Sequence, residues 1–215
     1  MYIFDIDGTL LYTIDSISYY INKAFADFGL GQVPKDEVRK NVGNGPIVLV
    51  NKCLKYLDIE DENIQKKVLD HYNRIYDDNP SYLTKPYEGI REELEKIKKR
   101  GELLVAFSNK PDSTCKKVLT DLWPAGYFDM ILGFKENIKR KPNPEGLYII
   151  GQRFEEKMTD IVYFGDSEVD IECGRNAGVF TVACAWGFRD KAFLEEQKPD
   201  LIIDSPGEIN TIRRV

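Results

Sequence analysis

The sequence has little histidine and cysteine, and each shortage excludes a kind of site. One histidine, His71, occurs among 215 residues, so a multi-histidine metal centre is excluded, and a histidine-assisted nucleophile would have to use that residue. We expect His71 to be structural, beside the apolar stripe of a helix. No C-x-x-C pair occurs, which argues against zinc and is typical of buried thiols in a reducing compartment. The four cysteines are Cys53, Cys115, Cys173 and Cys184.

Basic residues and long apolar runs are also scarce. The chain carries 30 Lys and Arg against 36 Asp and Glu, a net charge of −6, whereas nucleic-acid-binding domains normally present a basic face. No stretch approaches the roughly 18 apolar residues of a membrane span, and no basic-then-apolar leader precedes the first structured segment. We therefore expect a cytoplasmic protein that binds neither nucleic acid nor a membrane; nothing in the sequence defines its oligomeric state.

The apolar residues that are present follow two different rhythms along the chain. Residues 2–9 are typical of a short buried strand that ends in a turn. Between about residues 15 and 82 the apolar spacing is helical only, with three stripes at residues 17–28, 47–57 and 64–75. After Pro86, strands and helices alternate, which favours right-handed crossovers and a parallel sheet.

These rhythms predict an α/β fold: a three-layer, doubly wound, Rossmann-like core with a mostly parallel sheet, plus an inserted all-α cap domain. We expect the core domain to comprise residues 1–13 and 84–215, and the cap domain residues 14–83. The later strands are expected near residues 103–107, 130–132, 161–164, 179–185 and 201–203, and the helices between them near 89–100, 112–123, 144–154 and up to about 177.

Polar residues gather where the expected strands end. Asp5 and Asp7 are two apart on the first strand, so both can face one crevice, and Asp166 closes a later strand. Because three carboxylates together repel one another, a hard cation such as Mg²⁺, which takes about six oxygen ligands, would explain the arrangement. Ser108 and Lys141 would add the hydrogen-bond donor and the positive charge that a phosphoryl group needs.

Four polar segments follow one another along the chain: Phe4-Asp5-Ile6-Asp7-Gly8-Thr9-Leu10, Phe107-Ser108-Asn109-Lys110-Pro111, Lys141-Pro142-Asn143-Pro144, and Phe164-Gly165-Asp166-Ser167-Glu168-Val169-Asp170-Ile171 with Asn176-Ala177-Gly178. Any one motif alone is weak, but the ordered set covers the chain from residue 4 to residue 178. This ordered set resembles the haloacid dehalogenase superfamily, and within it the phosphoglycolate-phosphatase-like branch with a helical cap inserted after the first strand.

The resemblance implies a role for each core residue. Asp5 would be the nucleophile that forms an aspartyl-phosphate, and Asp7 would be the general acid and then the general base. Ser108 and Lys141 would hold the phosphoryl oxygens. Dehalogenating members lack an acid at the position of Asp7, which favours phosphoryl transfer. Mg²⁺ would be bound by Asp5, by the backbone carbonyl of Asp7 and by Asp166, with direct or indirect support from Asp170.

The substrate itself is less well defined by the sequence. Relatives often carry Asp-Ser where this chain has Tyr12-Thr13, near the expected substrate mouth, so the leaving group stays open; we expect a small phosphorylated metabolite. The candidate substrate contacts are Gly8, Thr9, Asn109 and Lys110 in the core and the cap loop Gly43-Asn44-Gly45.

Two other functions compete with a Mg²⁺-dependent phosphomonoesterase. A phosphoglucomutase-like phosphoryl transferase would share the same motifs and cap position. A receiver-type signalling domain also places acidic residues, a hydroxyl and a lysine around Mg²⁺, but it would need its phosphoacceptor near the end of the third strand in a chain of about 120 residues, and this sequence fits that pattern poorly.

Overall fold

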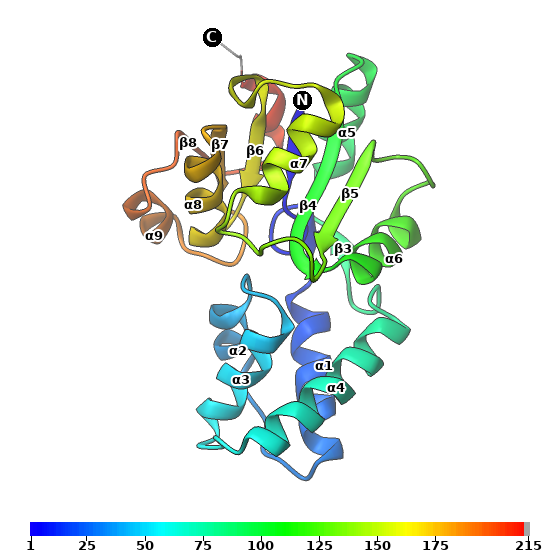
Figure 1. Cartoon of the computed structure of the whole chain (residues 1–215), viewed down its shortest axis with the longest axis vertical. Coiled ribbons are helices and arrows are strands. Elements are labelled where there is room, and N and C mark those ends of the chain that lie inside the picture. Colours follow the sequence, from blue (N-terminus) through cyan, green and yellow to red (C-terminus); the bar gives the residue numbers. More distant parts are fainter. Residues whose placement is uncertain (213–215) are drawn as a thin grey trace.

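The computed structural model describes residues 1–212, within which six parallel strands form one sheet in the order β5-β4-β1-β6-β7-β8. The short β1 lies in the middle and pairs with β4 and β6 (Figure 1). The carboxyl ends of these three strands therefore meet at one edge. The strands are β1 (Tyr2–Phe4), β4 (Leu104–Pro111), β5 (Met130–Phe134), β6 (Val162–Gly165), β7 (Phe180–Cys184) and β8 (Leu201–Ile203).

Helices cover both faces of this sheet because successive strand side chains point to opposite sides. Phe4 packs into the apolar cluster that includes α5 (Ile90–Lys99) and α6 (Asp112–Leu122). Its neighbour Ile3 packs into the cluster on the other face, with α7 (Glu145–Phe154) and α8 (Glu168–Ala177). The short α9 (Lys191–Glu196) packs near β8. The result is three layers, as the sequence predicts.

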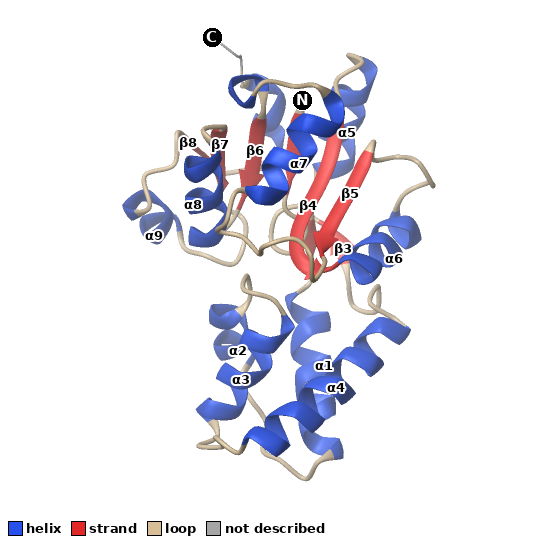
Figure 2. Cartoon of the chain, viewed as in Figure 1, coloured by secondary structure: helices blue, strands red, loops and turns tan. Residues whose placement is uncertain are grey.

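A second group of helices is inserted between the short strands β2 (Leu11–Tyr12) and β3 (Lys85–Pro86), which pair antiparallel. Figure 2 shows that this part of the molecule is helical throughout, while the sheet lies in the other half. The inserted helices form a separate apolar cluster, which Phe188 from the other part of the chain also joins. We call them the helical group: α1 (Ile14–Asp27), α2 (Lys35–Asn41), α3 (Pro46–Tyr56) and α4 (Glu62–Asp78).

The fold class expected from the sequence is confirmed, and the differences are local. The sequence did not predict α2, because Val38 is its one buried residue and a single apolar position makes no stripe. The treatment of residues 14–83 as a separate cap domain stays a prediction. In the described part of the chain, no helix is long and apolar enough to cross a membrane.

The scarce residues lie where the sequence predicts. All four cysteines are free and buried. His71 lies on α4, where its Nε2 is 2.8 Å from Asp27 Oδ2 and its Nδ1 is 2.8 Å from Arg74 Nη2. Its contacts therefore lie within the helical group.

Candidate active site

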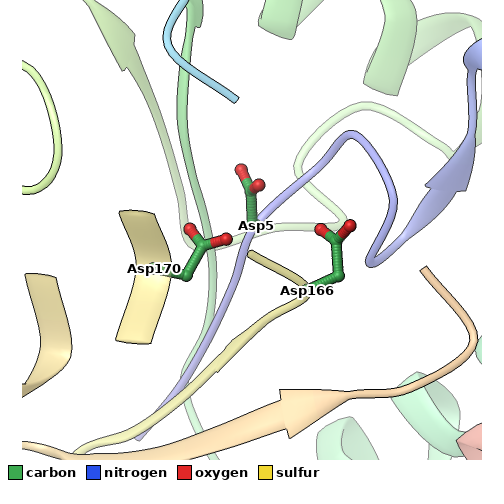
Figure 3. Close-up of side chains that lie close together, drawn as sticks. All are labelled: Asp5, Asp166 and Asp170. Carbon is green, nitrogen blue, oxygen red and sulfur yellow. The ribbon is translucent and has the colours of Figure 1, made fainter. Parts of the chain in front are cut away.

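Three buried carboxylates converge at the carboxyl edge of the sheet. Asp5 follows β1, Asp166 follows β6, and Asp170 lies in the first turn of α8. One oxygen from each carboxylate lies within 4.8 Å of the others. Figure 3 shows the three side chains gathered around the end of β1. Strand pairing thus brings together groups that are up to 165 positions apart in the sequence.

The buried ammonium of Lys141 lies between two of these carboxylates. Its Nζ is 2.9 Å from Asp5 Oδ1 and 2.6 Å from Asp170 Oδ1, and it also lies 3.1 Å from the Tyr163 hydroxyl. Burial acts to lower the pKa of Lys141, but the two carboxylates outweigh it and raise the pKa. Lys141 is therefore held as a cation beside Asp5.

Asp170 has no unused oxygen. Its Oδ1 accepts from Lys141 and from the Tyr163 hydroxyl, both at 2.6 Å, and its Oδ2 accepts from Ser167 Oγ at 2.6 Å and from Ser167 N at 3.2 Å. Burial acts to raise the pKa of Asp170, yet Lys141, Ser167 and Tyr163 together lower it. This ion pair fixes Lys141, so Asp170 acts on the site through that lysine.

Unlike that of Asp170, the pKa values of Asp5 and Asp166 are raised, because burial outweighs their favourable contacts. Burial raises the pKa of Asp5 to about 7, with Lys141 opposing and Asp170 and Asp7 adding to the rise. Burial also raises the pKa of Asp166 well above its ordinary value, and repulsion from Asp170 and Asp5 adds to this. In addition, Asp5 Oδ1 is buried without a hydrogen bond of good geometry, although Lys141 lies close to it. These two carboxylates are stabilised incompletely by the protein.

The side chain of Asp166 is held in a tight cradle. Its Oδ1 accepts from Thr9 Oγ1 at 3.1 Å, and its Oδ2 accepts from the backbone N–H of Phe188 at 2.8 Å. A Cβ on either Gly8 or Gly187 would overlap Asp166, and Gly8 also has a φ of +87°. Thr9 thus supports Asp166, and the small Gly8 leaves room for it; a contact of either residue with substrate stays a prediction.

The end of β4 carries Ser108, Asn109 and Lys110 in a segment where the register with β5 shifts. Such irregularities re-aim side chains near active sites. Asn109 Nδ2 donates to the carbonyls of Gly43 and Lys141, and its Oδ1 accepts from Lys141 N at 2.8 Å. Asn109 therefore joins the Lys141 loop to the helical group, and its amide donors contact protein acceptors.

Ser108 and Lys110 differ in how they are used. Lys110 Nζ donates to Asp7 Oδ1 at 2.8 Å, to Asp7 Oδ2 at 3.1 Å and to the hydroxyl of Tyr76, on α4, at 2.8 Å. Burial acts to lower the pKa of Lys110, but Asp7 and Tyr76 raise it. Within residues 1–212 the Ser108 hydroxyl donates to no protein acceptor, so it is available to a ligand.

A pocket that opens to solvent lies between this edge and the helical group. Asp5, Asp7, Ser108, Lys110 and Asp166 line its core side, and apolar and tyrosine side chains of the helical group line the other. Asn109 also lines it. Of the expected cap loop, Gly43 and Gly45 line the cavity, whereas Asn44 does not. Lys141 and Asp170 do not line it, but Lys141 contacts both Asp5 and Asp170.

Several residues of this site carry little sequence signal. Arg189 lines the cavity and donates to the carbonyls of Val42 and Arg39, so it ties α2 to the sheet. The backbone donor of Phe188 is invisible in a sequence. Tyr163 is part of a buried strand and resembles any core aromatic.

The carboxylates fit a hard divalent cation. Asp5 and Asp166 offer oxygen donors, which Mg²⁺ prefers, and the raised pKa of each means that its charged form is unfavourable without a cation. Asp170 fits less well as a ligand because both of its oxygens are already used. Asp5 and Asp166 could therefore bind a divalent cation directly, whereas Asp170 would act through Lys141.

Known proteins resemble this chain in sequence and in fold. A family model described as haloacid dehalogenase-like hydrolase matches residues 2–184. The phosphoglycolate phosphatase of Aquifex aeolicus (strain VF5) is 32% identical over 211 residues, covering 96% of this chain and 93% of that protein. The phosphoglycolate phosphatase of Haemophilus influenzae (strain KW20 / Rd) is 29% identical, covering 97% and 96%. The crystal structure of a predicted phosphoglycolate phosphatase from Haemophilus somnus 129pt superimposes with a TM-score of 0.92 at 27% identity, covering 98% of this chain and 96% of that one.

Proposed function

Because this chain belongs to the haloacid dehalogenase-like hydrolase family and is a phosphatase, we propose that it hydrolyses a small phosphomonoester with the help of Mg²⁺, through an aspartyl-phosphate on Asp5. The observation that carries this proposal is the position of Asp5, which lines the cavity and whose Oδ1 lies 2.9 Å from the buried ammonium of Lys141.

In this proposal Asp5 supplies the electron pair that attacks phosphorus. Its carboxylate must be ionised to react, and Lys141 favours that form against the effect of burial. An oxygen of Asp5 bonds to phosphorus while the bond from phosphorus to the leaving oxygen breaks. Ser108 donates its free hydroxyl to a phosphoryl oxygen, and Lys141 offsets the negative charge of the transferring group.

Asp7 then handles the proton. Its carboxyl group lines the cavity beside Asp5 and gives a proton to the departing alcohol oxygen. In the second step the same group takes a proton from water, whose oxygen attacks the aspartyl-phosphate and releases inorganic phosphate. Splitting one difficult displacement into two, with acid and base help worth about 10²–10⁴-fold, accounts for the need for two carboxylates.

The proposed Mg²⁺ site comprises Asp5, Asp166 and the backbone carbonyl of Asp7. When bound, Mg²⁺ would neutralise charge and polarise a phosphoryl oxygen. Thr9 and Phe188 hold Asp166 toward Asp5. Asp170 keeps Lys141 in place. The sequence also named Asp170 as a possible metal ligand. In this proposal Asp170 does not bind Mg²⁺ and supports the site through Lys141.

Small phosphorylated metabolites are the proposed substrates, and 2-phosphoglycolate is the first to test because the similar proteins are named for it. Purified protein should release inorganic phosphate in the presence of Mg²⁺ from at least one member of a panel of phosphometabolites. Asp5→Asn should abolish turnover while the protein stays folded.

Two outcomes would contradict the proposal. A folded Asp5→Asn protein that still releases phosphate with Mg²⁺ would show that Asp5 is not the nucleophile. Formation of an isomeric sugar phosphate without net release of inorganic phosphate would instead establish the phosphoryl-transferase alternative.

A further inference from the structure

Lys110 is a buried cation that the proposed chemistry does not use. Its side chain is 6% exposed, and its ammonium has three protons for three acceptors: both oxygens of Asp7 and the hydroxyl of Tyr76. An ammonium is expensive to bury, so a fully engaged one indicates a defined partner rather than a chance position. In this structure no proton of Lys110 is left for a substrate anion.

The partner that Lys110 fixes is the proposed proton donor. Asp7 is partly open to the cavity, with 13% of its side chain exposed, and a free carboxylate there could rotate about its side-chain bonds. Contacts to both Asp7 oxygens restrain that rotation, because one nitrogen lies 2.8 Å from Oδ1 and 3.1 Å from Oδ2. Proton transfer needs such restraint, since the acid must lie within hydrogen-bond reach of the leaving oxygen.

Tyr76 brings the helical group into the same network. It lies on the last turns of α4, is 4% exposed and packs against Tyr20 and Tyr72. The adjacent end of α4 is docked on α6, where Thr114 Oγ1 donates to Asp77 Oδ1 at 2.5 Å and Lys117 Nζ donates to the carbonyls of Asp77 and Asp78. The Tyr76 hydroxyl, the third acceptor for Lys110, is therefore in place when the end of α4 packs against α6.

We propose that Lys110 is a positioning residue, which holds Asp7 in the orientation for proton transfer, and that Tyr76 holds Lys110 and so makes this orientation depend on the seating of α4. The inference rests on the proposed function, specifically on the acid and base role of Asp7. It replaces substrate contact, the role that the sequence suggested for Lys110.

Two substrates, one whose leaving group needs a proton and one whose leaving group does not, distinguish an effect on proton transfer from an effect on substrate binding or folding. Lys110→Met should lower kcat for 2-phosphoglycolate about 10- to 100-fold, with KM nearly unchanged. With p-nitrophenyl phosphate, whose leaving group needs no proton, the first turnover should stay fast. A burst of p-nitrophenolate followed by slow turnover should result, because only release of the phosphoryl group from Asp5 still needs Asp7.

Two further variants test the proposal even if Lys110→Met fails to fold. Tyr76→Phe, which removes only the acceptor, should lower kcat a few-fold with the same burst. Tyr20→Phe is the matched control: it also loses one tyrosine hydrogen bond, to Asn79 O just after α4 at 2.9 Å, but none to Lys110, and should leave kcat unchanged. In a protein that already carries Asp7→Asn, adding Lys110→Met should not lower kcat further.

Each contrary result overturns the positioning role. A raised KM at constant kcat for Lys110→Met would mean that Lys110 binds substrate. Equal losses in the burst and in steady-state turnover, or losses that add to those of Asp7→Asn, would mean that Lys110 has a merely structural role. If the wild-type protein releases no phosphate in the presence of Mg²⁺, the proposed function fails instead, and this result is distinguishable because it precedes any variant.

Discussion

Replacing Asp170 by asparagine keeps the shape of the side chain and removes its charge from a fully buried site. The change leaves Lys141 with one anionic partner, Asp5, 2.9 Å away, in place of two. Breaking a buried pair by removing one partner costs about 3–5 kcal/mol. The lower end applies here because Asp5 remains and because repulsion of Asp170 with Asp5 and Asp166 is relieved.

A loss of about 3 kcal/mol in a chain of this size corresponds to a fall in Tm of about 6–12 °C. Thermal unfolding followed by circular dichroism, without divalent cations, measures it. The matched control is Asp204→Asn, since Asp204 pairs with Lys191 at 2.8 Å but is 62% exposed. That control should move Tm by no more than about 2 °C. Equal Tm values for the two variants would refute the assignment of Asp170 as the buried anchor of Lys141.

The other predictions concern the metal and the carboxylates around it. Mg²⁺ at 100 times its Kd should stabilise the wild-type protein by about 2.7 kcal/mol, and Asp166→Asn should lose most of the resulting rise in Tm in a thermal-shift titration. Without Mg²⁺, stability should fall as pH rises from about 4 to 7. The folded protein binds more protons than the unfolded chain over that range, because burial raises the pKa of Asp5 to about 7 and also raises that of Asp166; denaturant unfolding at several pH values checks the sign, and a rise in stability would contradict it. Gly187→Ala should weaken Mg²⁺ binding, because its Cβ would displace Asp166. An unchanged Mg²⁺ titration would contradict the inference that Gly187 leaves the space in which Asp166 is held.

The sequence alone predicted the sheet because its strands are short apolar runs that end in polar residues. Asp5, Asp166 and Lys141 could be predicted to meet, since parallel strands bring their carboxyl ends to one edge. Their contacts could not be predicted in the same way. Asp170 looked like a possible metal ligand, and only the positions of Tyr163 and Ser167 show that its oxygens are already occupied.

Hydrogen-bonding capacity alone does not decide which residues contact the substrate. Asn109, Lys110 and Thr9 follow strand ends and carry polar groups, so they were expected to face the ligand. In the fold they also form hydrogen bonds with Lys141, Asp7 and Asp166 respectively. A sequence shows which donors exist, but not how many of them the protein itself uses.

The antiparallel pairing of β2 with β3 brings the two ends of the inserted helices side by side. Leu11 lies opposite Pro86 and Tyr12 opposite Lys85, so the chain leaves the sheet and returns to it at neighbouring points, with Cα atoms about 4.5–5.5 Å apart. A segment with adjacent ends can be exchanged for another without stretching the remainder of the chain. This ribbon is therefore a natural junction for chimaeras, in which a different helical insertion is grafted onto an unaltered set of strand-end carboxylates.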